Sequence, residues 1–173
     1  MPAVPSRFGY LRGQACPAGS DAPTPCDGTS YTTAGLQASC VKCASGSHLT
    51  KSNGVGTCTL CAAGTSSSSS DVACEPCGEG LYSAAGATKC VSASAGFYVN
   101  AAKTAEVACE DASVYCQNGQ KSSVVAGFYS TPASGDGTQR TGQTKCEAGY
   151  YCSGGIKTGC AVDEVSVVGI THP

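Results

Sequence analysis

The chain has no tryptophan, one methionine and two histidines among its 173 residues, and its large apolar side chains are few. Leucine, isoleucine, valine and phenylalanine together account for 24 residues, about 14% of the chain. That share lies below the roughly 20% under which a chain without crosslinks tends to remain disordered. A core of packed apolar side chains therefore cannot by itself offset the entropy cost of ordering this backbone.

Positive charge and long apolar runs are also scarce. Ten lysines and arginines are scattered singly along the chain, and the formal net charge is -2. This argues against nucleic acid as a partner, because no basic patch can form. No apolar run approaches the roughly 18 residues of a membrane span. The first five residues, MPAVP, lack the basic start of a secretion signal, so we expect neither a span nor a signal in this segment.

Residue patterns that carry catalysis are missing as well. His48 and His172 belong to no Ser-His-Asp or Cys-His set, and no phosphate-binding glycine motif or calcium loop is present. The neighbouring acids Glu106, Glu110 and Asp111 are expected to form a solvated surface. We therefore expect no enzymatic activity, no cofactor and no metal site.

Cysteine and glycine are abundant instead, at 14 and 23 residues. Three C-x-x-C pairs follow one another at near-equal intervals: Cys40 with Cys43, Cys58 with Cys61, and Cys74 with Cys77. A glycine stands three residues after each pair. Alignment on that glycine extends the series to seven repeats, with Gly19, Gly46, Gly64, Gly80, Gly96, Gly127 and Gly149. Ala93 and Val124 stand where the other repeats have cysteine.

The segments between the cysteines predict short strands and turns. Asn53-Gly54 and Asn118-Gly119 are hairpin-type turn signals, and no window shows a sustained helical period. Pairs such as Phe97-Tyr98 and Phe128-Tyr129 follow the glycine and predict a small core in each repeat, with one ring against a disulfide. The expected fold is small, disulfide-rich, mostly β and irregular, an elongated tandem array of short cysteine-rich repeats with little helix. The expected parts are an N-terminal arm (1–15), a repeat array (16–116), a cysteine-poor repeat and loop (117–145), a terminal repeat (146–160) and a β-prone tail (161–173).

The chemistry of the cysteines has two interpretations. The spacing of Cys40, Cys43, Cys58 and Cys61 is near that of a zinc ribbon. A zinc site ends at four ligands, however, whereas these pairs continue, and eight further single cysteines would have no role. Disulfides are therefore favoured over zinc. A bridge that closes a loop of about 15 residues contributes about 3 kcal/mol to the free energy of unfolding. Redox catalysis by C-x-x-C would require a βαβ pattern, which is absent.

The missing cysteine at Ala93 favours one connectivity. If the second cysteine of each pair bonds to the first of the next, Cys43–Cys58, Cys61–Cys74 and Cys77–Cys90 are complete, and only Cys109 loses its partner. Cys116 lies seven residues away and can bond to Cys109. In the interleaved alternative, the first cysteine of one pair bonds to the first of the next and the second to the second. Cys77 would then have no partner, because position 93 is alanine. Six cysteines stay unassigned: Cys16, Cys26, Cys40, Cys146, Cys152 and Cys160.

Several segments resemble the ephrin-receptor-like cysteine-rich repeats, relatives of growth-factor-receptor and tumour-necrosis-factor-receptor modules. The segments that carry the likeness are Cys16-Pro-Ala-Gly19, Pro25-Cys26-Asp-Gly28-Thr-Ser-Tyr31, Cys40-Val-Lys-Cys43 and Cys146-Glu-Ala-Gly-Tyr-Tyr-Cys152. The loops rich in alanine, serine and threonine are similar to the immobilisation antigens of ciliates and other protist coat proteins. The likeness covers roughly residues 16 to 160 and departs at Ala93, at Val124 and through 117–145. It implies an extracellular, disulfide-laddered module for spacing, coating or adhesion, without catalytic residues.

These observations predict an extracellular or cell-surface structural protein, a surface-coat or filament-forming subunit. It would associate with itself or with another extracellular protein, through an assembly strand formed by the tail residues Val165, Val167, Val168 and Ile170. The serines Ser66, Ser67, Ser68, Ser69 and Ser70 are candidate sites for O-linked glycan. One alternative is a ligand-binding or adhesion ectodomain that contacts its partner through a loop at 130–142. The second alternative is an intracellular zinc-binding protein.

Overall fold

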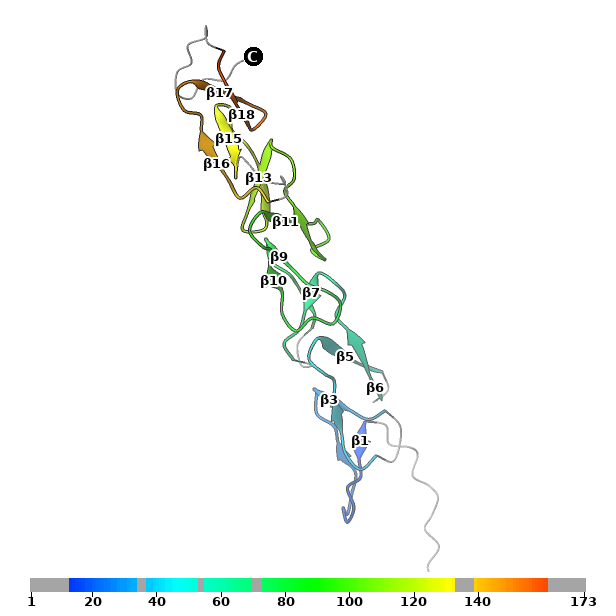
Figure 1. Ribbon diagram of the computed structural model, residues 1–173. Helices are drawn as coiled ribbons and strands as arrows, with labels where there is room; N and C mark the ends of the chain where they lie inside the picture. The colour runs from blue at the N-terminus through cyan, green and yellow to red at the C-terminus, as the bar shows by residue number, and fades with distance from the viewer. Residues whose placement is uncertain (1–12, 34–36, 53–54, 70–72, 133–138, 162–173) are drawn as a thin grey trace, which may run out of the picture. The chain divides into compact units, whose positions relative to one another are not determined.

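The computed structural model describes residues 13–33, 37–52, 55–69, 73–132 and 139–161. Within these ranges all the regular secondary structure is β-strand, arranged as nine two-stranded antiparallel sheets, and no helix is present (Figure 1). The described part of the chain thus contains no helix that could cross a membrane. The predicted disulfide-rich, mostly β and irregular fold is confirmed.

Each sheet is a hairpin of two strands consecutive in sequence, and we number the hairpins 1 to 9 in chain order. Hairpins 1 to 4 are β1 (Gln14–Ala15) with β2 (Thr24–Pro25), β3 (Ser30–Tyr31) with β4 (Val41–Lys42), β5 (Ser47–Ser52) with β6 (Val55–Leu60), and β7 (Thr65–Ser66) with β8 (Glu75–Pro76). Hairpins 5 to 9 are β9 (Leu81–Tyr82) with β10 (Val91–Ser92), β11 (Phe97–Val99) with β12 (Glu106–Ala108), β13 (Val114–Gln117) with β14 (Gln120–Ser123), β15 (Phe128–Thr131) with β16 (Gly142–Lys145), and β17 (Tyr150–Ser153) with β18 (Ile156–Gly159).

The contacts divide the chain into two units. The first consists of Met1–Pro76 and Ala84–Lys89, and the second of Cys77–Ser83 and Cys90–Pro173. Hairpins 1 to 4 therefore belong to the first unit, together with the loop of hairpin 5. The strands of hairpin 5 and the whole of hairpins 6 to 9 belong to the second.

Glycine starts most of the hairpins. Six of the seven aligned glycines directly precede a first strand and have positive φ: Gly46, Gly64, Gly80, Gly96, Gly127 and Gly149. The turn that delivers the strand is closed by a backbone hydrogen bond, as from Ser47 N–H to the carbonyl of Ala44 at 3.2 Å. Only glycine adopts this left-handed backbone at little cost, so the C-x-x-G pattern marks the start of a hairpin.

The repeat count predicted from glycine differs from the observed count. Gly19 closes the same kind of turn, but it lies in the loop between β1 and β2, and Gly13 (φ 82°) precedes β1 instead. Hairpins 2 and 7 have no leading glycine. Their turns are closed by aspartate side chains, whose carboxylates accept hydrogen bonds from the N–H of Thr29 and Ser113 at 2.9 and 2.8 Å. A glycine alignment cannot detect an aspartate turn, which is why seven repeats were counted where nine hairpins form.

Two-residue turns close hairpins 7 and 9. Asn118 and Gly119 have φ of 52° and 72° and connect Gln117 to its partner Gln120, as the Asn-Gly signal predicts. Gly154 and Gly155 form an equivalent turn in hairpin 9, with φ of 57° and 77°. The other predicted turn, at residues 53 and 54, lies outside the described residues.

Consecutive hairpins are joined by a repeated backbone hydrogen bond. We call the residue two positions after the start of each first strand the stacking position. In six hairpins its N–H donates to a carbonyl of the next hairpin: Cys16 to Gln37, Ser67 to Ala87, Ser83 to Lys103, Val99 to Gly119, Cys116 to Arg140 and Ser130 to Gly155, at 2.7 to 3.2 Å.

The side chains at the stacking position form much of the protein's interior. Thr32, Cys116 and Ser130 are fully buried at 0% exposure, and Ser67 and Ser83 are nearly so. The buried set thus consists mainly of cysteine, serine and threonine. Small hydroxyl side chains fill the space between closely stacked hairpins, which explains how the chain folds with so few large apolar residues.

Candidate functional site: the links between hairpins

We call the residue directly after the second strand of a hairpin the closing position. The links between hairpins start at this residue or at the one after it. Seven of the nine closing positions are cysteine: Cys26, Cys43, Cys61, Cys77, Cys109, Cys146 and Cys160. The N–H of this residue donates back to the residue that precedes the first strand, as from Cys61 to Gly46 at 2.9 Å and from Cys109 to Gly96 at 2.8 Å. The closing residue therefore completes one hairpin and faces the next.

Four closing cysteines form what we call long bridges. Each bonds to a cysteine three residues before the closing position of the next hairpin: Cys26–Cys40, Cys43–Cys58, Cys61–Cys74 and Cys77–Cys90. Their Cα–Cα distances are 5.5 to 5.7 Å, within the usual range for disulfides. Three of these pairs are those that the loop-closing scheme proposed. The first pairs Cys26 and Cys40, which sequence reasoning left unassigned.

Two closing cysteines form short bridges, in which the partner lies at the stacking position of the next hairpin. Cys109 bonds to Cys116, as the sequence suggested, and Cys146 bonds to Cys152. In both receiving hairpins the long-bridge position on the second strand is occupied by a lysine. Lys121 lies 5.2 Å from the centre of the Tyr98 ring, within the range of a cation–π contact.

Two junctions have no disulfide, and a side-chain acceptor takes its place. Ala93 and Val124 occupy the closing position, and the residue after each donates its N–H to the side chain at the long-bridge position. Ser94 N–H donates to Glu106 Oε2 at 2.6 Å, and its hydroxyl to Oε1 at 3.1 Å. Val125 N–H donates to Gln143 Oε1 at 2.8 Å. We call these two junctions clamps.

The clamps give one of the three neighbouring acids a role that the sequence did not suggest. Glu110 and Asp111 are exposed and Glu106 is half-buried, but Glu106 also links hairpins 5 and 6, and Asp111 closes the turn before hairpin 7. Sequence reasoning missed both roles. The available signal was position: Glu106 stands three residues before Cys109, where four other hairpins have cysteine.

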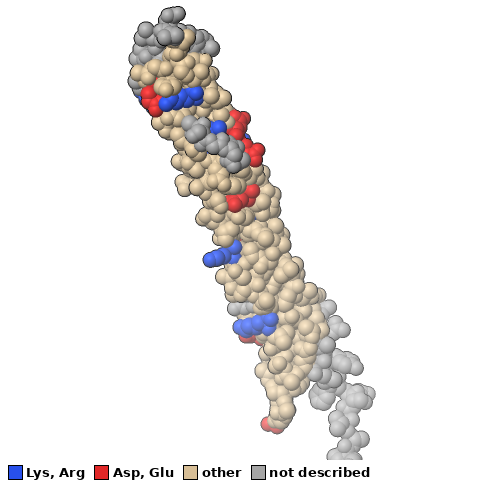
Figure 2. All heavy atoms as spheres, viewed as in Figure 1, with Lys and Arg blue, Asp and Glu red and all other residues tan. Residues whose placement is uncertain are grey.

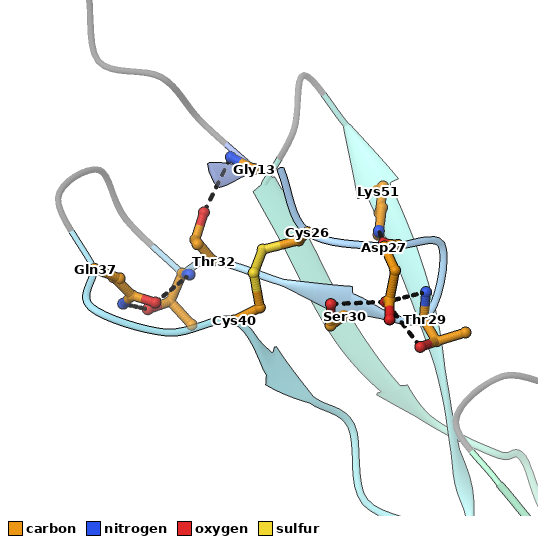
Figure 3. The surroundings of a disulfide bond; sticks show 10 residues. Gly13, Cys26, Asp27, Thr29, Ser30, Thr32, Gln37, Cys40 and Lys51 are labelled. Atoms are coloured by element: carbon orange, nitrogen blue, oxygen red, sulfur yellow. Dashed lines mark hydrogen bonds between the residues drawn. A yellow bond between two sulfur atoms is a disulfide. The ribbon is translucent and has the colours of Figure 1, made fainter. Parts of the chain in front are cut away.

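The surroundings of the first bridge show how polar side chains support a link (Figure 3). Asp27 follows Cys26 directly. Its Oδ1 accepts a hydrogen bond from the hydroxyl of Ser30 at 2.7 Å and another from the hydroxyl of Thr29 at 2.8 Å. These bonds, with that from Thr29 N–H, lower the pKa of Asp27 from 3.8 to about 2. Gly13 N–H, drawn in the same view, donates to the Thr32 hydroxyl at 3.1 Å.

The last bridge is packed against an aromatic ring. Tyr129 is 9% exposed and forms one buried cluster with Cys146 and Cys152, as expected for a ring beside a disulfide. Lys157 lies 5.1 Å from the centre of this ring and forms an ion pair of 2.7 Å with Glu147. The hydrogen bond from Lys157 lowers the pKa of Glu147 and raises that of Lys157 itself. The junction of hairpins 8 and 9 thus combines a disulfide, a ring and an ion pair.

Two cysteines are free, so the structure contains six bridges and not seven. Cys16 is exposed and Cys160 is half-buried. Cys40, Cys43, Cys58 and Cys61, which a zinc ribbon would require as thiolates, are all in disulfides. Among the described residues no three His, Cys, Asp or Glu side chains lie close enough to share a metal ion.

The other candidate residues are distributed as follows. Ser66 belongs to β7, and Ser67 is 3% exposed at a stacking position, so the serine run does not form a uniformly exposed loop. Ser68 is exposed and Ser69 half-buried, whereas Ser70 lies outside the described residues. Also outside them are the assembly-strand residues Val165, Val167, Val168 and Ile170, and residues 133–138 of the 130–142 loop.

Comparison with known proteins gives no family assignment. No protein-family model matches the chain, and no curated protein sequence matches it. On the face shown in Figure 2 the charged side chains stand singly or in small groups, without a broad patch of one sign. What the described geometry provides is a disulfide at six junctions between hairpins and a hydrogen-bonded clamp at two. The six disulfides indicate an oxidising environment.

Proposed function

We propose that this chain is an extracellular structural protein, a subunit of a cell-surface coat or filament whose repeats form a crosslinked spacer. Its likeness to ephrin-receptor-like repeats and protist coat proteins supports this proposal. No catalytic role is part of it.

One observation carries the proposal: every junction between consecutive hairpins is fastened, and by three interchangeable means. Long bridges and short bridges join the closing residue to the next hairpin, and clamps join the residue after it. The distinctive residues of this chain recur at each junction and are not gathered at one site. Such a distribution suits a protein with a mechanical role, in which each repeat transmits load to the next.

Electron microscopy of the secreted, purified chain tests the proposal. A coat or filament subunit should form regular assemblies at micromolar concentration under oxidising conditions. Dispersed monomers at every concentration would refute the proposal and favour the ligand-binding ectodomain.

The tail provides a second test. Deletion of residues 161–173 should abolish assembly while the six disulfides still form, because the tail supplies the strand that completes a neighbour's sheet. A matched variant replaces Val165, Val167, Val168 and Ile170 with threonine, which retains strand propensity. It should assemble more weakly than the parent but still assemble. Undiminished assembly of the deletion variant would exclude this role for the tail.

A further inference from the structure

We propose that Cys160 of one chain forms a short bridge with Cys16 of a second copy, which joins copies head to tail by disulfides. The partner is thus another copy of this chain, bonded through the two cysteines that are free in the monomer. The inference deepens the proposed structural function and rests on it.

Cys160 is half of an unfinished link. It occupies the closing position of hairpin 9, and its N–H donates to the carbonyl of Gly149 at 3.0 Å, as Cys109 N–H does to Gly96 and Cys146 N–H to Gly127. All six of the other closing cysteines bond forward, to a cysteine of the hairpin that follows. Cys160 thus has the same place in its hairpin as the six cysteines that bond forward, but its own thiol is free.

Cys16 is the other half. It occupies the stacking position of hairpin 1, the position at which Cys116 and Cys152 receive the short bridges. Its backbone is held in the same way, because Cys16 N–H donates to Gln37 as Cys116 N–H donates to Arg140, at 2.7 and 2.8 Å. Cys16 therefore shares both its position in the hairpin and its backbone hydrogen bond with Cys116, which receives a short bridge.

Exposure shows which contact is missing. Cys116 and Cys152, bonded to the preceding hairpin, are 0% and 1% exposed. Cys16 occupies the same position and is exposed. A closing cysteine arriving from another copy would both bond to Cys16 and cover it, as Cys109 and Cys146 do for their partners.

The two halves differ, which fixes the direction of the link. One copy carries one closing thiol and one stacking thiol, so a bridge between copies leaves a thiol of each kind at the two ends. Such a contact is heterologous and continues from copy to copy. A bridge between two Cys16 residues would join two receiving sides and has no counterpart among the six bridges.

The bond forms by thiol–disulfide exchange with a small disulfide such as oxidised glutathione. The exposed Cys16 thiolate attacks one glutathione sulfur, which forms a mixed disulfide and releases one reduced glutathione. The Cys160 thiolate then attacks the sulfur of Cys16 and releases the second. One disulfide is broken and one is formed, and the two cysteine protons end on the two glutathione thiols.

Two single variants, Cys16→Ser and Cys160→Ser, test the bridge by complementation in a glutathione redox buffer. Each alone should migrate as a monomer on a non-reducing gel, because each lacks one half. An equimolar mixture should give covalent dimers and no larger species, and the wild type should give a ladder of multimers. Mass spectrometry should identify the peptide that joins Cys160 to Cys16. Retention of the six internal bridges in each variant controls for folding.

Other outcomes overturn the bridge. Dimers of Cys160→Ser alone would mean that Cys16 bonds to itself. A wild-type monomer with two free thiols, or one with none because Cys16 and Cys160 bond within the chain, would also refute it, as would a mixture without dimers.

The double variant Cys16→Ser/Cys160→Ser separates this inference from the proposed function. Covalent dimers in the mixture, with no assemblies in the microscope for the wild type, would support the bridge and refute the structural function. Assemblies from both wild type and double variant, without a crosslinked peptide, would support the function and refute the bridge.

Discussion

Hairpins 2 and 7 each depend on one aspartate, which does what a glycine does elsewhere. Asp27 and Asp111 turn the chain by accepting hydrogen bonds from the N–H groups of Thr29 and Ser113. The ionised carboxylate is the stronger acceptor. Hydrogen bonds from the hydroxyls of Ser30 and Thr29, and then from Thr29 N–H, lower the pKa of Asp27, and the bond from Ser113 N–H is the main cause of the lowered pKa of Asp111. Local order at these turns is therefore linked to pH.

For Asp27 the direction of the pH effect follows from the lowered pKa. The folded value of about 2 lies below the ordinary 3.8, so the contribution to stability is complete above pH 3.8 and is lost as pH falls through about 2. The amide proton of Thr29, followed by NMR, should shift with a midpoint near pH 2. In Asp27→Asn this transition should be absent, because the amide does not titrate there. A midpoint at or above 3.8 in the parent would contradict the assignment.

Two adjacent glycines in hairpin 9 offer a matched comparison. Both have positive φ, but a methyl group on Gly154 would meet open space, whereas on Gly155 it would collide with the backbone of Ala112. Gly154→Ala should lower the free energy of unfolding by about 1 kcal/mol. Gly155→Ala should lower it by about 1–3 kcal/mol more, since close stacking is also lost. Urea denaturation measures the free energy of unfolding of both variants. Equal decreases would mean that Gly155 does not lie against the backbone of Ala112.

Among the elements, the links between hairpins are interchangeable in position but differ in strength. A clamp provides two or fewer hydrogen bonds at an exposed site, each worth about 1 kcal/mol, whereas a disulfide contributes about 2–4 kcal/mol. The junction of hairpins 5 and 6, held by Ser94 and Glu106, is therefore the place where a crosslink can be added.

The variant Ala93→Cys/Glu106→Cys should form a fifth long bridge, because Ala93 occupies the closing position of hairpin 5 and Glu106 the long-bridge position of hairpin 6. The new loop has the 13-residue separation of Cys61–Cys74 and Cys77–Cys90. The free energy of unfolding should rise by about 1–3 kcal/mol after the lost clamp is subtracted. Ala93→Cys alone should add one free thiol and no stability. Two added free thiols in the double variant would contradict the equivalence of clamp and bridge.

The sequence allowed the long bridges to be predicted better than the hairpins themselves. The C-x-x-C pairs are visible because a bridge needs two cysteines at fixed positions, and the loss at Ala93 favoured the loop-closing scheme over the interleaved one. Hairpins 2 and 7 were missed because an aspartate turn resembles any polar loop. The linking role of Glu106 was missed because several residue types can accept a hydrogen bond. Only the structure shows that Glu106 lies within hydrogen-bond distance of Ser94. Cys146–Cys152 was not assigned because a short bridge uses the first strand, a position seen only after the hairpins are aligned.

In the molecule as a whole, disulfides supply the stability that an apolar core supplies in most domains. Loss of one native disulfide from a small domain costs about 2–5 kcal/mol, against a total stability of about 5–15 kcal/mol. Reduction of all six bridges without denaturant should therefore unfold the chain, with loss of NMR dispersion. Treatment with a zinc chelator under oxidising conditions should leave the spectrum unchanged. Retained dispersion after full reduction, or unfolding by the chelator, would show that something other than disulfides holds the fold.

The central claim is that each closing cysteine bonds forward to the next hairpin, and direct mapping of the disulfides tests it. The non-reduced chain should be digested with pepsin at acid pH, where exchange is suppressed, and the crosslinked peptides identified by mass spectrometry. The account predicts six internal pairs: Cys26–Cys40, Cys43–Cys58, Cys61–Cys74, Cys77–Cys90, Cys109–Cys116 and Cys146–Cys152. Peptides that join Cys40 to Cys58 or Cys43 to Cys61, first with first and second with second, would contradict it.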